Sequence, residues 1–92
     1  MKIHELYTNE SKWTKRAEAR NSEGDKTFFD DHEATCFCLF GALFKCYPDN
    51  KERRGIRLRI EARLNFVPIT QWNDDPNRTF EEVKQLAVDL DI

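Results

Sequence analysis

Residues 69–90 read ITQWNDDPNRTFEEVKQLAVDL and carry the clearest local structural signals in the chain. Thr79 stands three residues before Glu82, which is the spacing of a capping box at a helix N-terminus. Behind this cap, apolar residues recur every three or four positions, as on the buried face of a helix: Phe80, Val83, Leu86, Ala87 and Leu90. The sequence therefore predicts a helix over residues 79–90.

The residues ahead of this helix predict a turn that follows a large apolar anchor. Residues 73–77 are turn formers, since Asn and Asp side chains bond to nearby backbone and proline fixes one dihedral angle. Arg78 is close in sequence to Asp74 and Asp75, so we expect an ion pair there. We expect the Trp72 indole to pack in the core, because small cores usually satisfy the indole N–H, and a binding platform is the alternative. These residues indicate architecture and not a reaction centre.

Upstream of this stretch, residues 33–47 are almost entirely apolar and predict a buried central helix. A run of this length is more often a helix than a strand, because strands rarely exceed about eight residues. Gly41 lies inside the run, where a glycine costs about 1 kcal/mol relative to alanine. Such a cost suggests that another backbone packs closely against Gly41.

Residues 50–66 carry signals for both a helix and a strand. Asp49 and Glu52 have the spacing of a second capping box, which favours a helix over residues 50–65. Apolar residues at every second position favour a strand instead. In a helix these residues would form two opposite stripes, one of Ile56, Ile60, Leu64 and Val67 and the other of Leu58, Ala62 and Phe66.

Residues 13–29 predict a short β-hairpin, with a helix ending near Arg20 as the alternative. Two runs flank a cluster of turn formers in which Gly24 can supply a positive φ. The first run alternates in character from Trp13 onward, and the second is rich in strand formers. The overall prediction is a mainly α single domain of three to four helices with this hairpin, and α+β is the alternative class.

Length and composition describe one small globular domain over residues 1–92. No apolar run approaches the roughly 20 residues needed to cross a bilayer, and no secretory signal is visible. We therefore expect a cytoplasmic protein with no membrane partner. Three cysteines do not make a disulfide framework, so we expect reduced, buried thiols at Cys36, Cys38 and Cys46.

Three phrases, taken together, resemble a family of small bacterial and phage-associated domains of unknown function. The first phrase joins Trp13-Thr14 to Ala19-Arg20-Asn21 and Gly24, the second runs from Cys38 to Leu43, and the third has the pattern W-N-D-x-P-x-R-T-x-x-E-V from Trp72. The resemblance implies a helix over residues 50–65, because members are typically helical between the second and third phrases. The family has no established activity. We interpret its motif residues as structural: Trp13, Cys38, Gly41, Trp72, Asn73, Asp74, Pro76, Arg78, Thr79 and Glu82.

Three groups of reactive residues do not form convincing sites. Cys36 with His32 four residues earlier would make a nucleophile pair, but the apolar neighbours argue for burial and an inert thiol. A metal site built from His32, Cys36, Cys38 and Cys46 would need two cysteines that a helix places about 200° apart. The adjacent acids at 30–31 and 74–75 are typical of helix and turn caps. We expect no catalytic residue, no metal and no cofactor.

The expected function is that of a non-enzymatic protein-interaction or regulatory module. Net charge is −2, but residues 51–63 hold six basic and two acidic residues, a local charge of +4. The partner would be a protein, with a second copy of the chain as one option. A nucleic-acid-associated module using the Arg53–Arg63 flank is the alternative, although the sequence pI of about 5.7 is unlike a basic footprint. A small Cys-dependent enzyme is the second alternative. The expected interaction surface consists of Arg53, Arg57, Arg59, Arg63, Leu58 and Phe66.

Overall fold

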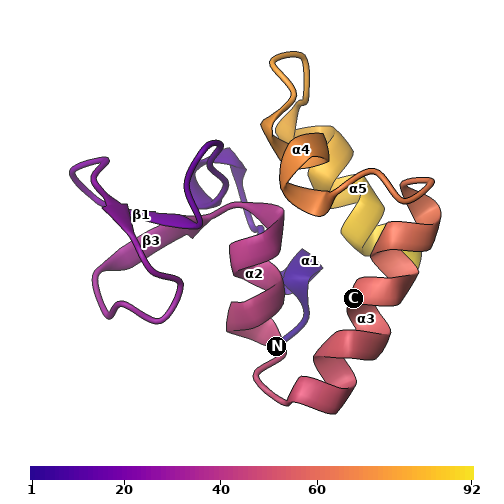
Figure 1. Ribbon diagram of the computed structural model, residues 1–92. Coiled ribbons are helices and arrows are strands. Elements are labelled where there is room, and N and C mark those ends of the chain that lie inside the picture. Colours follow the sequence, from indigo (N-terminus) through magenta and orange to yellow (C-terminus); the bar gives the residue numbers. More distant parts are fainter.

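Five α-helices and a small sheet make up the structure, a computed structural model that describes residues 1–92 (Figure 1). The sheet lies to one side of helix α2, and helices α3, α4 and α5 lie on the other (Figure 1). The class is therefore α+β, so the prediction of a mainly α domain was right for the helices and incomplete for the sheet. In chain order the elements are α1 (Ile3–Leu6), the 3-10 helix η1 (Glu10–Lys12), β1 (Ala19–Asn21), β2 (Lys26–Thr27), β3 (Ala34–Phe37), α2 (Leu39–Cys46), α3 (Asn50–Arg63), α4 (Ile69–Asp74) and α5 (Phe80–Leu90).

The sheet is built around β1, which pairs with both other strands in antiparallel fashion in the order β2-β1-β3. Strands β1 and β2 confirm the predicted hairpin, although they are shorter than the predicted range of 13–29. Asn21 shapes the turn between them, because its Oδ1 accepts the backbone N–H groups of Glu23 and Asp25 at 3.0 and 2.9 Å. Gly24 then takes a positive φ of 84°. The hairpin thus forms where the local turn chemistry placed it.

The predicted helix over residues 33–47 was wrong in its first part, because residues 34–37 form strand β3. This strand pairs with β1, a partner more than ten residues away, and the long-range pairing overrides the helix-like apolar pattern. Helix α2 begins only after Cys38. The Cys38 N–H donates to the Glu18 carbonyl at 3.1 Å, and its Sγ accepts the N–H of Gly41 at 3.3 Å. These contacts turn the chain from strand into helix.

Helix α3 resolves the conflict over residues 50–66 in favour of a helix. Asp49 caps it by accepting the backbone N–H of Glu52 at 2.8 Å. The two apolar stripes lie on opposite sides of the helix. On the inner stripe Ile60 and Leu64 are buried. The residues of the outer stripe are all exposed: Leu58, Ala62 and Phe66.

Two further helices follow, of which only the second was predicted. Helix α4 includes Trp72 and begins after Pro68, so the turn expected over residues 73–77 comes only once α4 has ended. Helix α5 has the predicted capping box. The Thr79 Oγ1 accepts the Glu82 N–H at 3.3 Å, and a Glu82 carboxylate oxygen accepts the Thr79 N–H at 3.0 Å.

A single cluster of 16 buried residues forms the core and draws the two ends of the chain together. Ile3 and Ile92 are both fully buried. The His4 N–H donates to the Ile92 carbonyl at 3.0 Å, and Lys2 pairs with Asp91 at 2.7 Å. The N and C labels accordingly lie close together in Figure 1. No helix has the length and apolar character that a membrane span requires.

Candidate functional site

Asn73 is the buried polar centre of the predicted motif, with 0% of its surface exposed. Its Oδ1 accepts the Trp13 indole N–H at 2.7 Å and the Leu39 backbone N–H at 3.0 Å. Its Nδ2 donates to the Thr14 carbonyl at 3.1 Å and to Asp74 Oδ1 at 3.0 Å. These four bonds use the full hydrogen-bonding capacity of an amide. Asn73 therefore ties the N-terminal segment and α2 to α4, and it has no polar atom left for a ligand.

Arg78 stacks on Trp72 instead of forming the predicted ion pair with Asp74 or Asp75. Its guanidinium carbon lies 3.9 Å from the indole ring centroid, and its Nε donates to the Trp72 carbonyl at 2.9 Å. Its Nη1 pairs with Glu82 at 3.1 Å. The ion-pair prediction was wrong because Asp74 instead accepts a backbone N–H from the loop before β1, at 2.9 Å.

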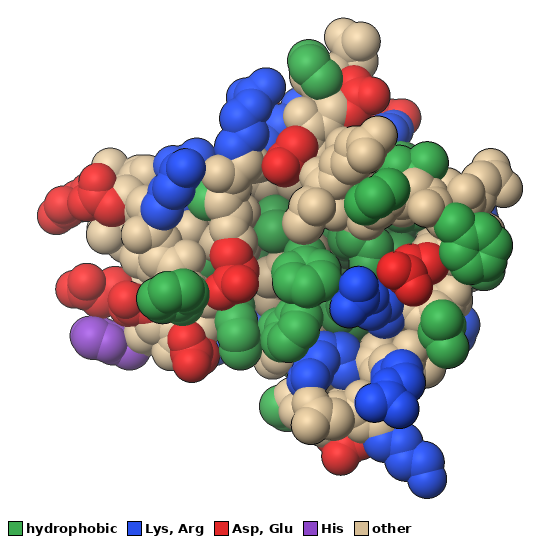
Figure 2. Space-filling view, viewed as in Figure 1, with side chains coloured by type: hydrophobic (Ala, Val, Ile, Leu, Met, Phe, Trp, Pro, Cys, Tyr) green, Lys and Arg blue, Asp and Glu red, His purple; other side chains and the backbone are tan.

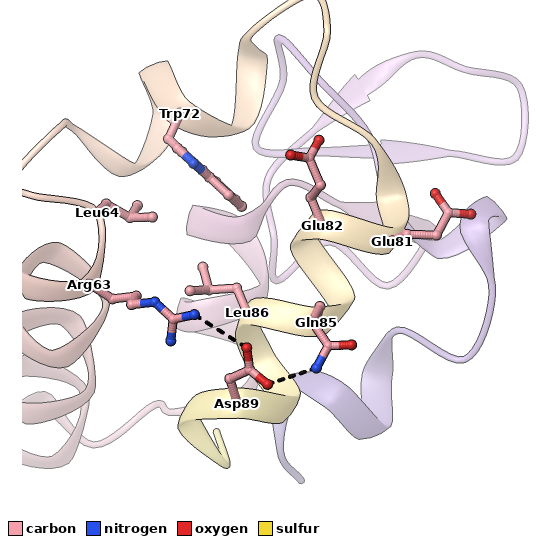
Figure 3. A pocket seen from close by; sticks show the side chains of 8 residues that line it. All are labelled: Arg63, Leu64, Trp72, Glu81, Glu82, Gln85, Leu86 and Asp89. Atoms are coloured by element: carbon pink, nitrogen blue, oxygen red, sulfur yellow. Dashed lines mark hydrogen bonds and ion pairs between the residues drawn. The ribbon is translucent and has the colours of Figure 1, made fainter.

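An open groove of about 530 Å³ lies beside Trp72 (Figure 3). Figure 3 shows the indole pointing from α4 toward Leu86 of α5, with Glu82 and Asp89 on the same helix. The charges along this groove are mostly neutralised by two ion pairs, Arg63–Asp89 at 3.3 Å and Arg78–Glu82 at 3.1 Å. The groove therefore offers little unpaired polar chemistry.

Gly41 marks a very close approach of two backbone segments. A Cβ atom at this position would lie 2.1 Å from the Glu18 carbonyl oxygen, a distance that no real Cβ contact shows. The sequence predicted such an approach from the presence of a glycine inside an apolar helix. Gly41 is thus required by packing between α2 and the chain before β1.

The three cysteines are free thiols that differ in exposure. Cys36 is half-buried, and its Sγ lies 3.8 Å from the Arg20 carbonyl, whereas Cys38 and Cys46 are buried. Burial raises the pKa of the Cys38 thiol and raises the pKa of Cys46 to about 11. Both thiols are therefore protonated at neutral pH, which makes them poor nucleophiles.

His32 does not complete a site with these thiols. Its side chain is 93% exposed, and its Nδ1 lies 3.8 Å from Asp31. The structure brings together no group of three or more His, Cys, Asp or Glu side chains that could hold a metal ion. The adjacent acids cap turns, since Asp31 accepts the Glu33 N–H and Asp75 accepts the Asn77 N–H, both at 2.8 Å.

Three phenylalanine rings, those of Phe29, Phe44 and Phe40, pack in a row. The Phe29 and Phe44 centroids are 5.4 Å apart, and those of Phe44 and Phe40 are 4.9 Å apart. Arg53 lies 4.2 Å from the Phe44 centroid, and Arg57 lies 5.7 Å from that of Phe40. Figure 2 shows hydrophobic side chains in the middle of one face of the molecule, with acidic side chains along the lower part of the sheet end and several basic ones at the lower α3 end, although side chains of the opposite charge occur at both ends. We call this surface the aromatic face and define it by Phe29, Phe40, Phe44, Phe66, Arg53, Arg54 and Arg57.

Two hollows lie along the aromatic face, and Arg57 lines both of them. The smaller, of about 210 Å³, is lined by Phe44 and by Arg53 and Arg54. The larger, of about 380 Å³, is also lined by Phe40, Phe66, Glu61, Pro68, Ile69 and Thr70. The face therefore combines a cationic hollow with a more apolar one.

Phe66 combines an unfavourable backbone conformation with an exposed side chain. Helix α3 ends in a Schellman motif, in which the Asn65 N–H donates to the Ala62 carbonyl at 3.3 Å and the Phe66 N–H to the Glu61 carbonyl at 2.7 Å. Asn65 and Phe66 have φ angles of 55° and 62°, a left-handed conformation that is unusual for a bulky residue. The Phe66 side chain is nevertheless 74% exposed. The left-handed backbone of Phe66 costs free energy, and burial of its ring does not offset that cost.

The predicted interaction surface divides between two sides of α3. Arg53 and Arg57 belong to the aromatic face together with Phe66. Arg59 donates to the Leu90 carbonyl and Arg63 pairs with Asp89, so both turn toward the C-terminal helix. The structure therefore does not gather the predicted arginines into one patch.

Sequence reasoning included Phe66 in the expected interaction surface but assigned Phe29 to the hairpin, and Phe40 and Phe44 to a core helix. Phe40 and Phe44 are four residues apart on α2, and Arg53 and Arg57 are four apart on α3. Side chains at this spacing are neighbours on a helix surface, so the sequence could have indicated a pair of phenylalanines on one helix and a pair of arginines on the next. The packing of α2 on α3, which brings the rows together, is not visible in the sequence.

Comparison with known proteins supports the resemblance seen in the sequence. Residues 4–88 match a family described as "Family of unknown function (DUF6197)". No curated protein and no solved structure matches the chain.

Proposed function

The chain belongs to the DUF6197 family of unknown function, and we propose that it is a non-enzymatic module that binds a protein partner through the aromatic face. The partner contributes an acidic segment that carries an apolar side chain. The module works in the bacterial or phage cytoplasm without a cofactor. The observation that carries this proposal is a row of partly exposed aromatic rings bordered by Arg53 and Arg54, which have no carboxylate partner.

Positive charge at the α3 end of the aromatic face is only partly neutralised within the chain, where Arg57 pairs with Glu61 at 3.3 Å. Lys51 and Arg54 are exposed, and their side chains make no hydrogen bond or ion pair. Arg53 bonds only to uncharged oxygens, including the Tyr47 carbonyl at 3.0 Å. Arginine forks suit carboxylate groups, because their planar donors can bind both oxygens at once. An acidic segment is therefore the chemistry that complements this end.

The apolar part of the face favours a partner with at least one large hydrophobic side chain. Phe66 is 74% exposed beside a hollow of about 380 Å³. Burying a side chain such as Phe or Leu there would contribute about 1.5–3 kcal/mol. Exposed apolar surface of this kind is typical of interaction sites.

The two alternative functions have weaker support. A nucleic-acid module needs a row of cations that follows the phosphates, but Arg59 and Arg63 are engaged with α5. A thiol enzyme needs an accessible, easily ionised cysteine, whereas Cys38 is buried with a raised pKa. A protein ligand suits the mixture of aromatic and cationic groups better.

Fluorescence polarisation with labelled peptides tests the proposal. The probe is an acidic peptide that contains one phenylalanine, and the two comparison peptides replace either the phenylalanine by serine or the acids by lysine. We expect the full chain to bind the probe more tightly than either comparison peptide. Binding should weaken as salt rises, because part of the attraction is between exposed charges.

Two variants place the binding on the aromatic face. Arg54→Glu should weaken peptide binding about tenfold or more, since it reverses an unpaired charge. Lys12→Glu is the matched control, because it changes net charge equally at a side chain of η1 that makes no hydrogen bond or ion pair. Equal affinity for all three peptides would refute the proposal. A DNA duplex that binds with a steep salt dependence, lost when Arg57 and Arg63 are changed to alanine, would support the nucleic-acid alternative.

A further inference from the structure

We infer that the acidic segment that binds the aromatic face comes from a second copy of the chain, so that two copies form a two-fold dimer. This inference rests on the proposed function, because it identifies the partner of the same surface. The segment is the loop of residues 23–33, which includes β2 and the connection to β3. We call it the acidic loop.

The acidic loop and the start of α3 carry opposite charges that are not neutralised within one copy. Residues 23–33 contain five acidic residues and one lysine, a local charge of −4. At the start of α3, Lys51 and Arg54 are exposed and make no ion pair. Within the loop only Asp31 lies near a basic side chain, the exposed His32 at 3.8 Å. The remaining loop carboxylates have no basic partner: Glu23, Asp25, Asp30 and Glu33.

Two exposed phenylalanines lie near the face, one in the acidic loop and one beyond the C-terminal end of α3. Phe28 in the acidic loop is 75% exposed, and Phe66 after α3 is 74% exposed. The position of Phe28 is fixed by its neighbour Phe29, whose N–H donates to Glu18 Oε2 at 2.7 Å and whose ring packs against Phe44. The exposed Phe28 ring could therefore contact another molecule with little loss of loop entropy.

A two-fold axis brings these complementary ends together. In a symmetric dimer the same surface occurs on both sides, so each end of one copy meets the opposite end of the other. The acidic loop lies at the sheet end of the face, Lys51 and Arg54 lie at the start of α3, and Figure 2 shows apolar side chains between the two ends. With the axis near Phe40 and Phe44, the acidic loop of each copy faces Lys51 and Arg54 of its partner. Phe28 then enters the partner copy's smaller hollow, which in each chain is lined by Phe44, Arg53 and Arg54.

Sedimentation equilibrium of the full chain tests this arrangement with two charge-reversal variants. The first carries Lys51→Glu with Arg54→Glu, and the second carries Asp30→Lys with Glu33→Lys. None of these four side chains makes a hydrogen bond or ion pair within the chain, so both variants should fold. We expect the wild type to dimerise with a dissociation constant in the micromolar range, about 1–100 µM.

Each variant alone should be monomeric at concentrations where the wild type is dimeric, because both contacts in its dimer become repulsive. An equimolar mixture of the two variants should form a heterodimer, since both contacts are then between opposite charges. Native mass spectrometry can identify that heterodimer by its mass. Glu81→Lys is a control, because Glu81 lies on the separate groove beside Trp72, and this variant should dimerise like the wild type.

Three outcomes would overturn the inference: a wild type that stays monomeric up to about 1 mM, a dimer that both variants leave intact, or variants that fail to associate when mixed. The labelled peptide of residues 23–33 separates this inference from the proposed function. If the chain is monomeric but binds an acidic, phenylalanine-containing peptide in a manner sensitive to Arg54→Glu, the function stands and the partner is another protein. If no such peptide binds, both fail.

Discussion

Replacing Asn73 by alanine should destabilise the fold more than any other change of a polar side chain. The substitution removes the acceptor of two N–H groups, the Trp13 indole and the Leu39 backbone amide. It also removes the donor to the Thr14 carbonyl. The Leu39 amide is the first of α2 and lies in the core, so it has no route to solvent once its acceptor is gone.

The expected loss of stability follows from the two N–H donors, of Trp13 and Leu39, that would be left without an acceptor. A buried polar group left without a partner costs about 1–3 kcal/mol, so two such groups cost about 2–6 kcal/mol. A domain of this size is stable by about 5–15 kcal/mol, which makes the expected loss of about 4 kcal/mol a large share of the total. With a urea m-value of about 1 kcal/mol/M, the unfolding midpoint should fall by about 4 M.

Urea unfolding followed by tryptophan fluorescence measures this loss, because Trp13 and Trp72 both lie beside residue 73. The matched control is Asn77→Ala, which makes the same chemical change in an exposed turn where the side chain has no hydrogen bond. We expect the control to remain within about 0.5 kcal/mol of the wild type. If Asn73→Ala loses less than about 1 kcal/mol, the hydrogen-bonded centre described here does not hold the elements together.

Four further changes probe other parts of the structure. Gly41→Ala should cost about 3 kcal/mol or more in urea unfolding, because its Cβ would overlap a backbone carbonyl, whereas Gly55→Ala, with nothing within 4 Å, should gain up to about 1 kcal/mol. The hydrogen bond from the Thr79 N–H holds the pKa of the Glu82 carboxyl below its usual 4.5. The ionised carboxylate therefore stabilises the fold above pH 4.5, and this stabilisation is lost as pH falls through the lowered pKa. Glu82→Gln should weaken this loss of stability in acid, measured by unfolding curves across pH. Iodoacetamide should leave Cys46 unmodified in the folded chain at pH 7 and label it in urea, since burial raises its pKa to about 11; rapid labelling of the folded chain would contradict its burial. Phe66→Gly should raise stability by about 0.5–1 kcal/mol, because relief of a left-handed φ exceeds the added freedom of the unfolded chain, and should weaken peptide binding in the polarisation assay.

Features with local causes could be predicted from the sequence. The box formed by Thr79 and Glu82 needs only residues three apart, so helix α5 was predicted with its correct start. The cap at Asp49 and the turn at Asn21 are local in the same sense. In each case the groups that stabilise the element lie within a few residues of one another.

Features with distant partners could not be predicted in this way. Residues 34–37 form a strand only because β1 supplies the other half of the ladder. Helix α4 was missed because Pro68 offers no side-chain cap and the helix is held instead by the contacts of Asn73. The aromatic face depends on how α2 packs on α3, and no sequence pattern reports that packing.

Phe66, at the end of α3, has a positive φ that disfavours folding, while its exposed side chain belongs to the proposed binding surface. Glycine would serve the helix terminus better than any other residue, so selection for stability alone would replace Phe66 over evolutionary time. Relatives that depend on the aromatic face should therefore retain a large side chain at this position, while relatives that have lost the interaction should drift toward glycine or asparagine.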